Sequence, residues 1–278
     1  MTQDLQAKID RAIKLLRDNE PQDDKGYGLA FSGGKDSCVI KQLAIEAGVK
    51  FKAAYSLTTM DPPPLLKFIR EKHPDVEWLS NGHFFDLMKK KGMPPNFRMR
   101  YCCHELKEQS LNGFSAKIIG VRASESLRRA KHWREVVEDN QRAGAIIVCP
   151  IVDWTEQDVW NFIKVRNIPY CDLYDKGYKR LGCIACPMTS VKNIKRELAA
   201  YPKFDAALRK TFDEMWETWH DKIMPAKGKY PEHRHFSSRF KNGKEWYEHH
   251  INRGHPPLEE TCQMELLFVG SNEERSGE

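Results

Sequence analysis

The sequence predicts an α/β fold, a mostly parallel sheet with helices on both faces, followed by a mainly helical C-terminal appendage. Short apolar strands alternate with helical patterns between residues 27 and 165, as is typical of a parallel sheet covered on both faces. From Asn193 to about Ile223, apolar residues recur at helical spacing instead. The 278 residues suffice for one large domain with a substantial appendage.

The expected elements follow one another along the chain. The N-terminus is a charged amphipathic helix, because Leu5, Ile9, Ile13 and Leu16 share one face. The expected strands are residues 27–31, 51–57, 76–79, 117–121 and 145–149. The expected helices are residues 38–47, one that begins at 62–64, 84–91 and 155–165.

The most informative segment is Ser32–Ser37, Ser-Gly-Gly-Lys-Asp-Ser, which lies between an expected strand and an expected helix. Two glycines let the backbone turn so tightly that several N–H groups can face one phosphate, and the helix N-terminus adds its positive dipole end. Lys35 adds a full charge, and Ser32 and Ser37 add hydroxyl donors. The spacing differs from that of the Walker A loop. The segment therefore predicts a phosphate-binding loop of a different kind.

Other loops of the sheet should meet this one, because ligands bind beyond the carboxyl ends of parallel strands. We expect the loops after residues 31, 57 and 121 to converge on one crevice. Arg122 follows such a strand end, and its guanidinium can bind two oxygens of one phosphate or sulfate. Ser126 and Arg129 follow near the same helix face.

Four cysteines form a second constellation, since Cys102 and Cys103 are adjacent and Cys183 and Cys186 form a C-x-x-C pair. Four thiolates can bind zinc or an iron–sulfur cluster. Adjacent cysteines fit one small tetrahedron poorly, so we expect a larger 4Fe-4S cluster. A redox dithiol at the adjacent pair and simple buried cysteines are the alternatives. The cysteines without such spacing, interpreted as core or near-site residues, are Cys38, Cys149 and Cys171.

Composition limits the class of protein. No apolar stretch reaches the roughly 18 residues of a transmembrane helix, and the charged N-terminal helix is not a signal peptide, so we expect a cytoplasmic protein without a membrane partner. Eight cysteines in such a chain favour metal binding or catalysis over disulfides. The net charge of +6 is compatible with a nucleic acid partner or with a site for charged nucleotides.

The charge is unevenly distributed and suggests three regions. Residues 191–257 hold 14 Lys/Arg against 9 Asp/Glu and six of the ten histidines, whereas 258–278 hold six Glu against one Arg. We expect a nucleotide-binding domain over 1–190, with the N-terminal helix and the four-cysteine site. A basic, aromatic-rich, mainly helical region over 191–257 and an acidic tail over 258–278 would follow. The basic region is either a surface for a phosphate backbone or a plain helical subdomain.

Four blocks in this order resemble the PAPS reductase and DndC-like branch of the PP-loop ATP pyrophosphatase superfamily, whose fold is Rossmann-like. Ser32–Ser37 is similar to the PP-loop pattern S-G-G-x-D-S. Cys102-Cys103 with Leu106-Lys107 resembles the CC block of iron–sulfur adenylyl-sulfate reductases, and Gly120–Ala130 is similar to the pattern G-x-R-x-x-x-S-x-x-R-A. The fourth block runs from Pro150 to Cys186.

The resemblance implies an enzyme that cleaves ATP to AMP and pyrophosphate and supports sulfur transfer to nucleic acid, as in DNA phosphorothioation or tRNA thiolation. It implies the cofactors ATP, Mg²⁺ and a 4Fe-4S cluster, with a nucleic acid acceptor and a cysteine desulfurase or other sulfur donor as partners. Lys35 and Asp36 would be catalytic, with Asp36 orienting the loop or holding the metal through water. The expected nucleotide-binding residues are Ser32, Gly33, Gly34, Lys35, Asp36, Ser37, Gly120, Arg122, Ser126 and Arg129, and the cluster ligands are Cys102, Cys103, Cys183 and Cys186.

One departure from the family pattern bears on the reaction. Reductases of sulfate assimilation end in an E-C-G-L-H segment whose cysteine attacks the sulfonucleotide, and this chain has no such segment. Its one late cysteine, Cys262, lies among glutamates, which raise a thiol pKa. The alternative function is therefore a phosphoadenylyl-sulfate or adenylyl-sulfate reductase with Cys262 as an atypical nucleophile. A third class is a nucleotide-sensing subunit without turnover.

Overall fold

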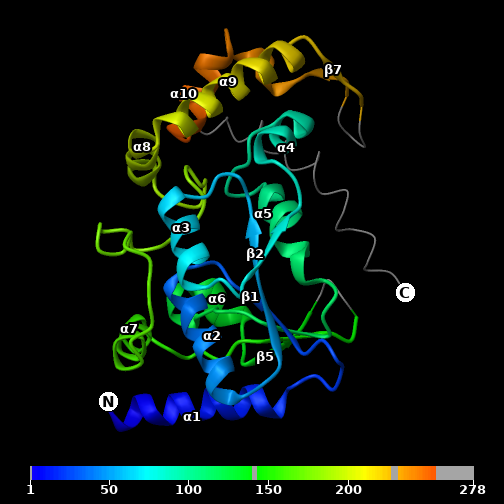
Figure 1. Ribbon diagram of the computed structural model, residues 1–278. Helices are drawn as coiled ribbons and strands as arrows, with labels where there is room; N and C mark the ends of the chain where they lie inside the picture. The colour runs from blue at the N-terminus through cyan, green and yellow to red at the C-terminus, as the bar shows by residue number, and fades with distance from the viewer. Residues whose placement is uncertain (1, 140–142, 227–230, 255–278) are drawn as a thin grey trace. The chain divides into compact units, whose positions relative to one another are not determined.

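A six-stranded sheet forms the core of the first of two units in the computed structural model (Figure 1). The structure describes residues 2–139, 143–226 and 231–254. The first unit comprises Met1–Asn81 and Glu105–Gly182, and the second comprises Gly82–His104 and the chain from Cys183 on. The predicted acidic tail over 258–278, with Cys262, lies outside the described residues.

The sheet has the strand order β3-β2-β1-β4-β6-β5. All neighbouring strands run parallel except β5, which is antiparallel to β6 at one edge. The predicted fold class, a mostly parallel sheet with helices, is confirmed. The strands are β1 (Tyr27–Ala30), β2 (Phe51–Leu57), β3 (Glu77–Ser80), β4 (Ala116–Ile118), β5 (Val136–Glu138) and β6 (Ile146–Val148).

Strand β1 is the point at which the strand order reverses. It pairs with β2 from Tyr27 opposite Phe51 onward, and with β4 through Gly28 and Leu29 on its other side. The chain moves outward from β1 to β3 and then returns to β4. In open α/β sheets, ligands bind beyond the carboxyl ends of the strands at such a reversal. The loops after β1 and β4 therefore lie where a ligand is expected.

Helices pack against each other beside this sheet. Helix α1 packs on α2, and α2 packs on α7. Leu5, Ile9 and Leu16 of α1 are buried, which confirms the predicted amphipathic helix. The helices of the first unit are α1 (Gln3–Asp18), α2 (Lys35–Ala47), α3 (Pro63–Lys72), α6 (Leu127–His132) and α7 (Glu156–Val165). This unit also contains the 3-10 helices η1 (Glu108–Leu111) and η2 (Ala123–Glu125). Helix α5 (Tyr101–Leu106) begins in the second unit and ends in the first.

Three elements differ from the sequence prediction. Helix α2 begins at Lys35 rather than at residue 38, because Gly34 is the N-cap and the end of the loop forms the first helical turn. The strand predicted over 117–121 ends at Ile118, and the residues after it form the loop to Arg122. The short edge strand β5 was not predicted, since three residues in a charge-rich stretch give too little periodicity.

The second unit is mainly helical, around α9. Helix α9 packs on α4, α8 and α10. The helical pattern predicted from 193 is interrupted at Tyr201, because Pro202 starts a new helix and cannot continue the old one. Its elements are α4 (Phe84–Lys91), α8 (Val191–Ala200), α9 (Pro202–Trp219), the strands β7 (Ile223–Met224) and β8 (His233–Arg234), η3 (Phe236–Arg239) and α10 (Gly243–Ile251).

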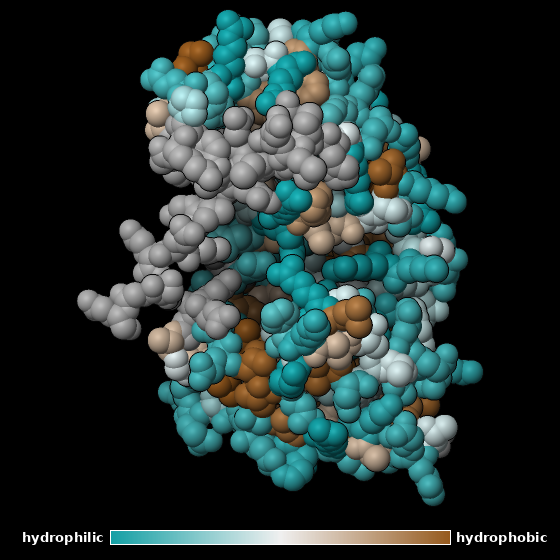
Figure 2. Space-filling view, turned by 180° about the vertical axis from the view of Figure 1, so that it is seen from behind, coloured by the Kyte–Doolittle hydropathy of each residue, from teal (hydrophilic) through white to brown (hydrophobic). Residues whose placement is uncertain are grey.

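The surface of the described residues is mostly polar. Figure 2 shows hydrophilic residues over most of one face, with hydrophobic residues gathered in its lower half. The most exposed large hydrophobic residue is Leu127, at the start of α6. Among the described residues, none of the helices combines the length and the hydropathy needed to cross a membrane.

Candidate functional site

The loop between β1 and α2 is held in a tight conformation by its own atoms. Gly33 has a φ of 70°, and a Cβ there would lie 2.7 Å from Leu65 and 2.8 Å from Ile69, so only glycine fits. The Ser37 hydroxyl donates to the Gly34 carbonyl at 2.8 Å, and the Gly34 N–H reaches the Ser32 hydroxyl at 3.4 Å. These contacts hold the loop in place directly before the N-terminus of a 13-residue helix.

Lys35 is buried at this helix start, with 4% of its surface exposed. Its Nζ lies 3.4 Å from Glu156 Oε1, on α7, and 3.7 Å from Asp36 Oδ2. It also reaches the Lys179 carbonyl at 3.5 Å. Carboxylates on two sides offset the cost of burying this ammonium group, which stands beside the predicted phosphate-binding loop.

Arg122 brings a second buried cation to the same place. Its Nε donates to Asp36 Oδ1 at 2.6 Å, and its other nitrogens reach Ser124 at 3.3 Å and Glu125 at 3.4 Å. A Cβ on Gly120 would lie 3.2 Å from the Asp36 backbone, so glycine allows this close approach of the two loops. Asp36 thus links Arg122 to Lys35, and the sequence-predicted loops after β1 and β4 do converge.

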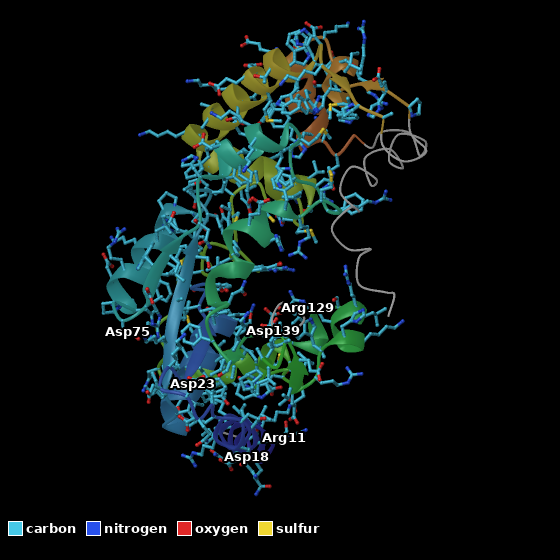
Figure 3. All side chains as sticks on the ribbon, turned by 90° about the vertical axis from the view of Figure 1, so that its right-hand side faces the viewer. Arg11, Asp18, Asp23, Asp75, Arg129 and Asp139 are labelled. Atoms are coloured by element: carbon cyan, nitrogen blue, oxygen red, sulfur yellow. The ribbon has the colours of Figure 1, made fainter. Side chains whose placement is uncertain are left out.

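Ser126 and Arg129 stabilise the start of α6. The Ser126 hydroxyl caps α6 by accepting from the Arg129 N–H at 3.2 Å. Arg129, labelled in Figure 3, pairs with Glu125, which in turn contacts Arg122. Both residues therefore stabilise the segment that carries Arg122.

Two further residues at this site were not predicted. Tyr174 accepts a hydrogen bond from the Lys35 N–H through its hydroxyl at 2.9 Å, and burial raises the pKa of this phenol. Glu156, whose position in the first turn of α7 suggested only a favourable charge at the helix N-terminus, pairs with Lys35. Tyr174 belongs to the sequence block 150–186, so its position in that block was the available signal.

The four predicted ligand cysteines all belong to the second unit. Cys102 and Cys103 lie on α5, Cys183 and Cys186 lie in a turn before α8, and all four are half-buried. The pKa of Cys102 is raised by its hydrogen bond with Cys103, then by burial and by the nearby sulfur atoms of Cys183 and Cys186. The structure thus brings the four thiols into one neighbourhood.

This neighbourhood is not a formed metal site. Over the described part of the chain, no three His, Cys, Asp or Glu side chains are arranged so that they could hold one metal ion. Four thiols are nevertheless the donor set that an iron–sulfur cluster requires. The cluster remains a prediction.

The turn that carries Cys183 and Cys186 is fixed by charged side chains. Ala185 adopts a φ of 55°, which is costly for a residue with a Cβ. Its N–H donates to Glu197 Oε2, on α8, at 2.9 Å. Arg253, at the end of α10, donates to the carbonyls of Pro187, at 2.8 Å, and Thr189. These contacts could not be predicted from the sequence, because they join residues 12 to 66 positions apart.

The remaining described cysteines are buried in the first unit. Desolvation raises the pKa of Cys38 and of Cys149 to about 12, and it also raises the pKa of Cys171. Buried thiols with raised pKa values are poor nucleophiles. Cys262 lies outside the described residues.

Comparison with known proteins identifies the family. The model of the phosphoadenosine phosphosulfate reductase domain matches residues 27–189, more than half of the chain. The chain belongs to this family. The PP-loop fold of this family agrees with the sheet order and with the loop after β1.

The two individual relatives described below share less than one third of their aligned residues with this chain. An uncharacterized protein of Methanocaldococcus jannaschii is 29% identical over 231 residues, 74% of this chain and 54% of that protein. An adenosine 5'-phosphosulfate reductase of Staphylococcus epidermidis is 32% identical over 148 residues, 51% of this chain and 58% of that protein. The chain thus spans about half the length of these curated relatives.

The fold likeness extends to solved structures. The FMN adenylyltransferase of Candida glabrata, in complex with FAD and inorganic pyrophosphate, superposes with a TM-score of 0.50 and 18% identity. The superposition covers 65% of this chain and 62% of that one. At this identity the likeness establishes the shared fold.

Proposed function

We propose that this protein is an iron–sulfur PP-loop enzyme that cleaves ATP to AMP and pyrophosphate and supports sulfur transfer to a nucleic acid. The observation that carries the proposal is the tight Ser32–Ser37 loop, with two buried cations beside it, at the reversal of the strand order. Such a site suits the concentrated negative charge of a departing pyrophosphate.

Each cation has a distinct part in this reaction. Lys35 supplies a charge at the helix N-terminus, where a phosphate group binds, and Mg²⁺ would add to it. Arg122 supplies a planar guanidinium at the adjoining strand end. Asp36 bonds to Arg122 and contacts Lys35, which favours the orienting role among the two that the sequence suggested.

The second unit supports the sulfur-transfer part of the proposal. Cys102, Cys103, Cys183 and Cys186 would ligate a 4Fe-4S cluster, which would carry or activate sulfur. The described residues of this unit include 17 Lys/Arg against 10 Asp/Glu, whereas those of the first unit include 24 against 23. The positive charge is thus concentrated in the unit with the cysteines, as suits a nucleic acid acceptor. A cysteine desulfurase or another donor would supply the sulfur.

The second candidate function is reduction of a sulfonucleotide. The family name and the relatives named adenosine 5'-phosphosulfate reductase favour it. That reaction needs a thiolate that attacks sulfur and releases the nucleotide. The described cysteines of the first unit are buried and hard to ionise, which leaves Cys262 as its candidate nucleophile.

One experiment separates the two functions. The anaerobically purified protein is given ATP with a nucleic acid preparation, or adenylyl sulfate, and AMP, pyrophosphate and sulfite are measured together with the mass of the Cys262 peptide. The proposal predicts pyrophosphate from ATP, with no sulfite and no sulfo adduct on Cys262. A sulfo adduct at Cys262 that thioredoxin removes would establish the reductase instead.

A further inference from the structure

The Tyr174 hydroxyl lies directly over the phosphate-binding loop. It accepts the Lys35 N–H at 2.9 Å, and a Cβ built on Gly34 would stand 3.4 Å from the same oxygen. The Lys35 Nζ lies 5.4 Å from the centre of the Tyr174 ring. One phenol thus contacts both the backbone and the side chain of the residue that begins α2.

The Tyr174 ring is held in place by its own neighbours. Its ring lies 5.2 Å from that of Trp160 in an edge-to-face arrangement, and its backbone N–H donates to the Cys171 carbonyl at 3.1 Å. Its carbonyl accepts from Gly177 at 3.0 Å. The hydroxyl is therefore a positioned group rather than the end of a freely rotating chain.

The hydrogen-bond capacity of a phenol indicates what this position can do. A tyrosine hydroxyl can donate one proton and accept from other donors. Here the oxygen accepts from Lys35, which leaves the proton available to a further acceptor. Within the first unit this donor stands beside Lys35 and the loop glycines, where an anion is expected.

We propose that Tyr174 is a phosphate-binding residue, whose hydroxyl accepts from the Lys35 N–H and donates its proton to a non-bridging oxygen of the bound nucleotide or of pyrophosphate. The backbone N–H of Lys35 thus acts on the ligand through the phenol rather than by a direct hydrogen bond. This inference rests on the proposed nucleotide site and adds a residue to it. It also explains why the Lys35 N–H is occupied by a neutral group, since a carboxylate there would repel the ligand.

The test is the affinity of Tyr174→Phe for ATP, inorganic pyrophosphate and adenosine, measured by calorimetry. The variant keeps the ring and removes the hydroxyl. Loss of one hydrogen bond to a charged group should weaken ATP and pyrophosphate binding by about tenfold or more. Adenosine, which has no phosphate, should bind equally to the variant and the wild type.

Tyr170→Phe is the matched control. Tyr170 belongs to the same aromatic cluster, 5.3 Å from the Trp160 ring, but its hydroxyl contacts Asp175 rather than the loop. This control should bind all three probes as the wild type does, and circular dichroism should show that both variants are folded.

Each result that would contradict the inference has its own interpretation. Unchanged or tighter binding of pyrophosphate by Tyr174→Phe would overturn the inference, tighter binding showing that the hydroxyl blocks the site. An equal loss of adenosine binding would show that the hydroxyl supports the site as a whole rather than contacting a phosphate, and it would also overturn the inference. If the wild type bound neither ATP nor pyrophosphate, the proposed function would fail together with this inference.

Discussion

Two turns in this chain each hold a backbone N–H against a side-chain oxygen, and they differ in the charge of that oxygen. At the start of α2, the Lys35 N–H meets the neutral hydroxyl of Tyr174, and in the turn before α8 the Ala185 N–H meets the carboxylate of Glu197. The first arrangement adds no negative charge at the N-terminus of α2, where the anionic ligand is proposed to bind. The second places a negative charge beside two cysteines.

The two turns also differ in the energetic cost of their backbone conformations. Gly33 carries the positive φ of the first turn at little cost, because it has no Cβ. Ala185 carries the positive φ of the second turn at a cost of roughly 1–2 kcal/mol. The first turn is therefore favoured by its own sequence, whereas the second depends on Glu197 and Arg253.

The largest expected effect concerns the cysteines. Cys186→Ala should abolish the brown colour and the visible absorption of the anaerobically prepared protein, because a thiolate is lost from the predicted cluster. Cys149→Ala, which removes a buried thiol of the first unit, should leave the iron content unchanged. Visible spectra and iron counts measure both. Stoichiometric zinc without iron in the wild type would contradict the cluster.

The next effect concerns the charge at the first turn. Lys35→Ala should slow the release of pyrophosphate from ATP by about 10²-fold, the usual scale for losing one preorganised charge contact. Lys52→Ala, on the exposed side of β2, is the matched control and should retain the wild-type rate. A wild-type rate of pyrophosphate release by Lys35→Ala would show that Lys35 does not contribute to the reaction.

A smaller effect should follow from the second turn. Glu197→Ala leaves the Ala185 N–H without its partner, a loss on the order of 1–3 kcal/mol, and iron should dissociate faster. Glu197→Gln keeps an acceptor but removes the charge, so it should retain iron and raise the reduction potential of the cluster. Glu217→Gln, exposed on α9, is the control for potentiometry. Equal potentials in all three proteins would argue against any influence of Glu197 on the cluster.

The smallest effects compare the two backbones directly. Gly33→Ala should lower the unfolding free energy by more than about 1 kcal/mol, because strain adds to the contacts with α3. Ala185→Gly should raise it by up to roughly 1 kcal/mol, since glycine accepts the positive φ. Chemical denaturation measures both changes. The same sign for the two variants would refute the contrast between the turns.

The sequence predicted the parts of the molecule that depend on local pattern. The ends of β2 and α4 agree with the expected 51–57 and 84–91, and the glycine-rich loop lies where the strand and helix patterns placed it. These features follow from periodicity and turn chemistry within a few residues.

The residues that complete the two turns could not be predicted in this way. Tyr174 and Lys35 are 139 positions apart, and Arg253 is 66 positions from Pro187, so only the tertiary fold brings them together. Glu197 is another such residue, since a glutamate at that place on an amphipathic helix is compatible with a solvated surface. Tertiary packing rather than local propensity determines these contacts.

The most direct test of the account is the position at which ATP is cleaved. The anaerobic protein with its cluster is incubated with Mg²⁺, a bulk nucleic acid preparation, sulfide as the sulfur donor and ATP labelled at the α-phosphate, and the labelled product is separated. The account predicts labelled AMP with an equal amount of pyrophosphate, and their loss in Lys35→Ala. Labelled ADP with inorganic phosphate, and no AMP, would contradict it.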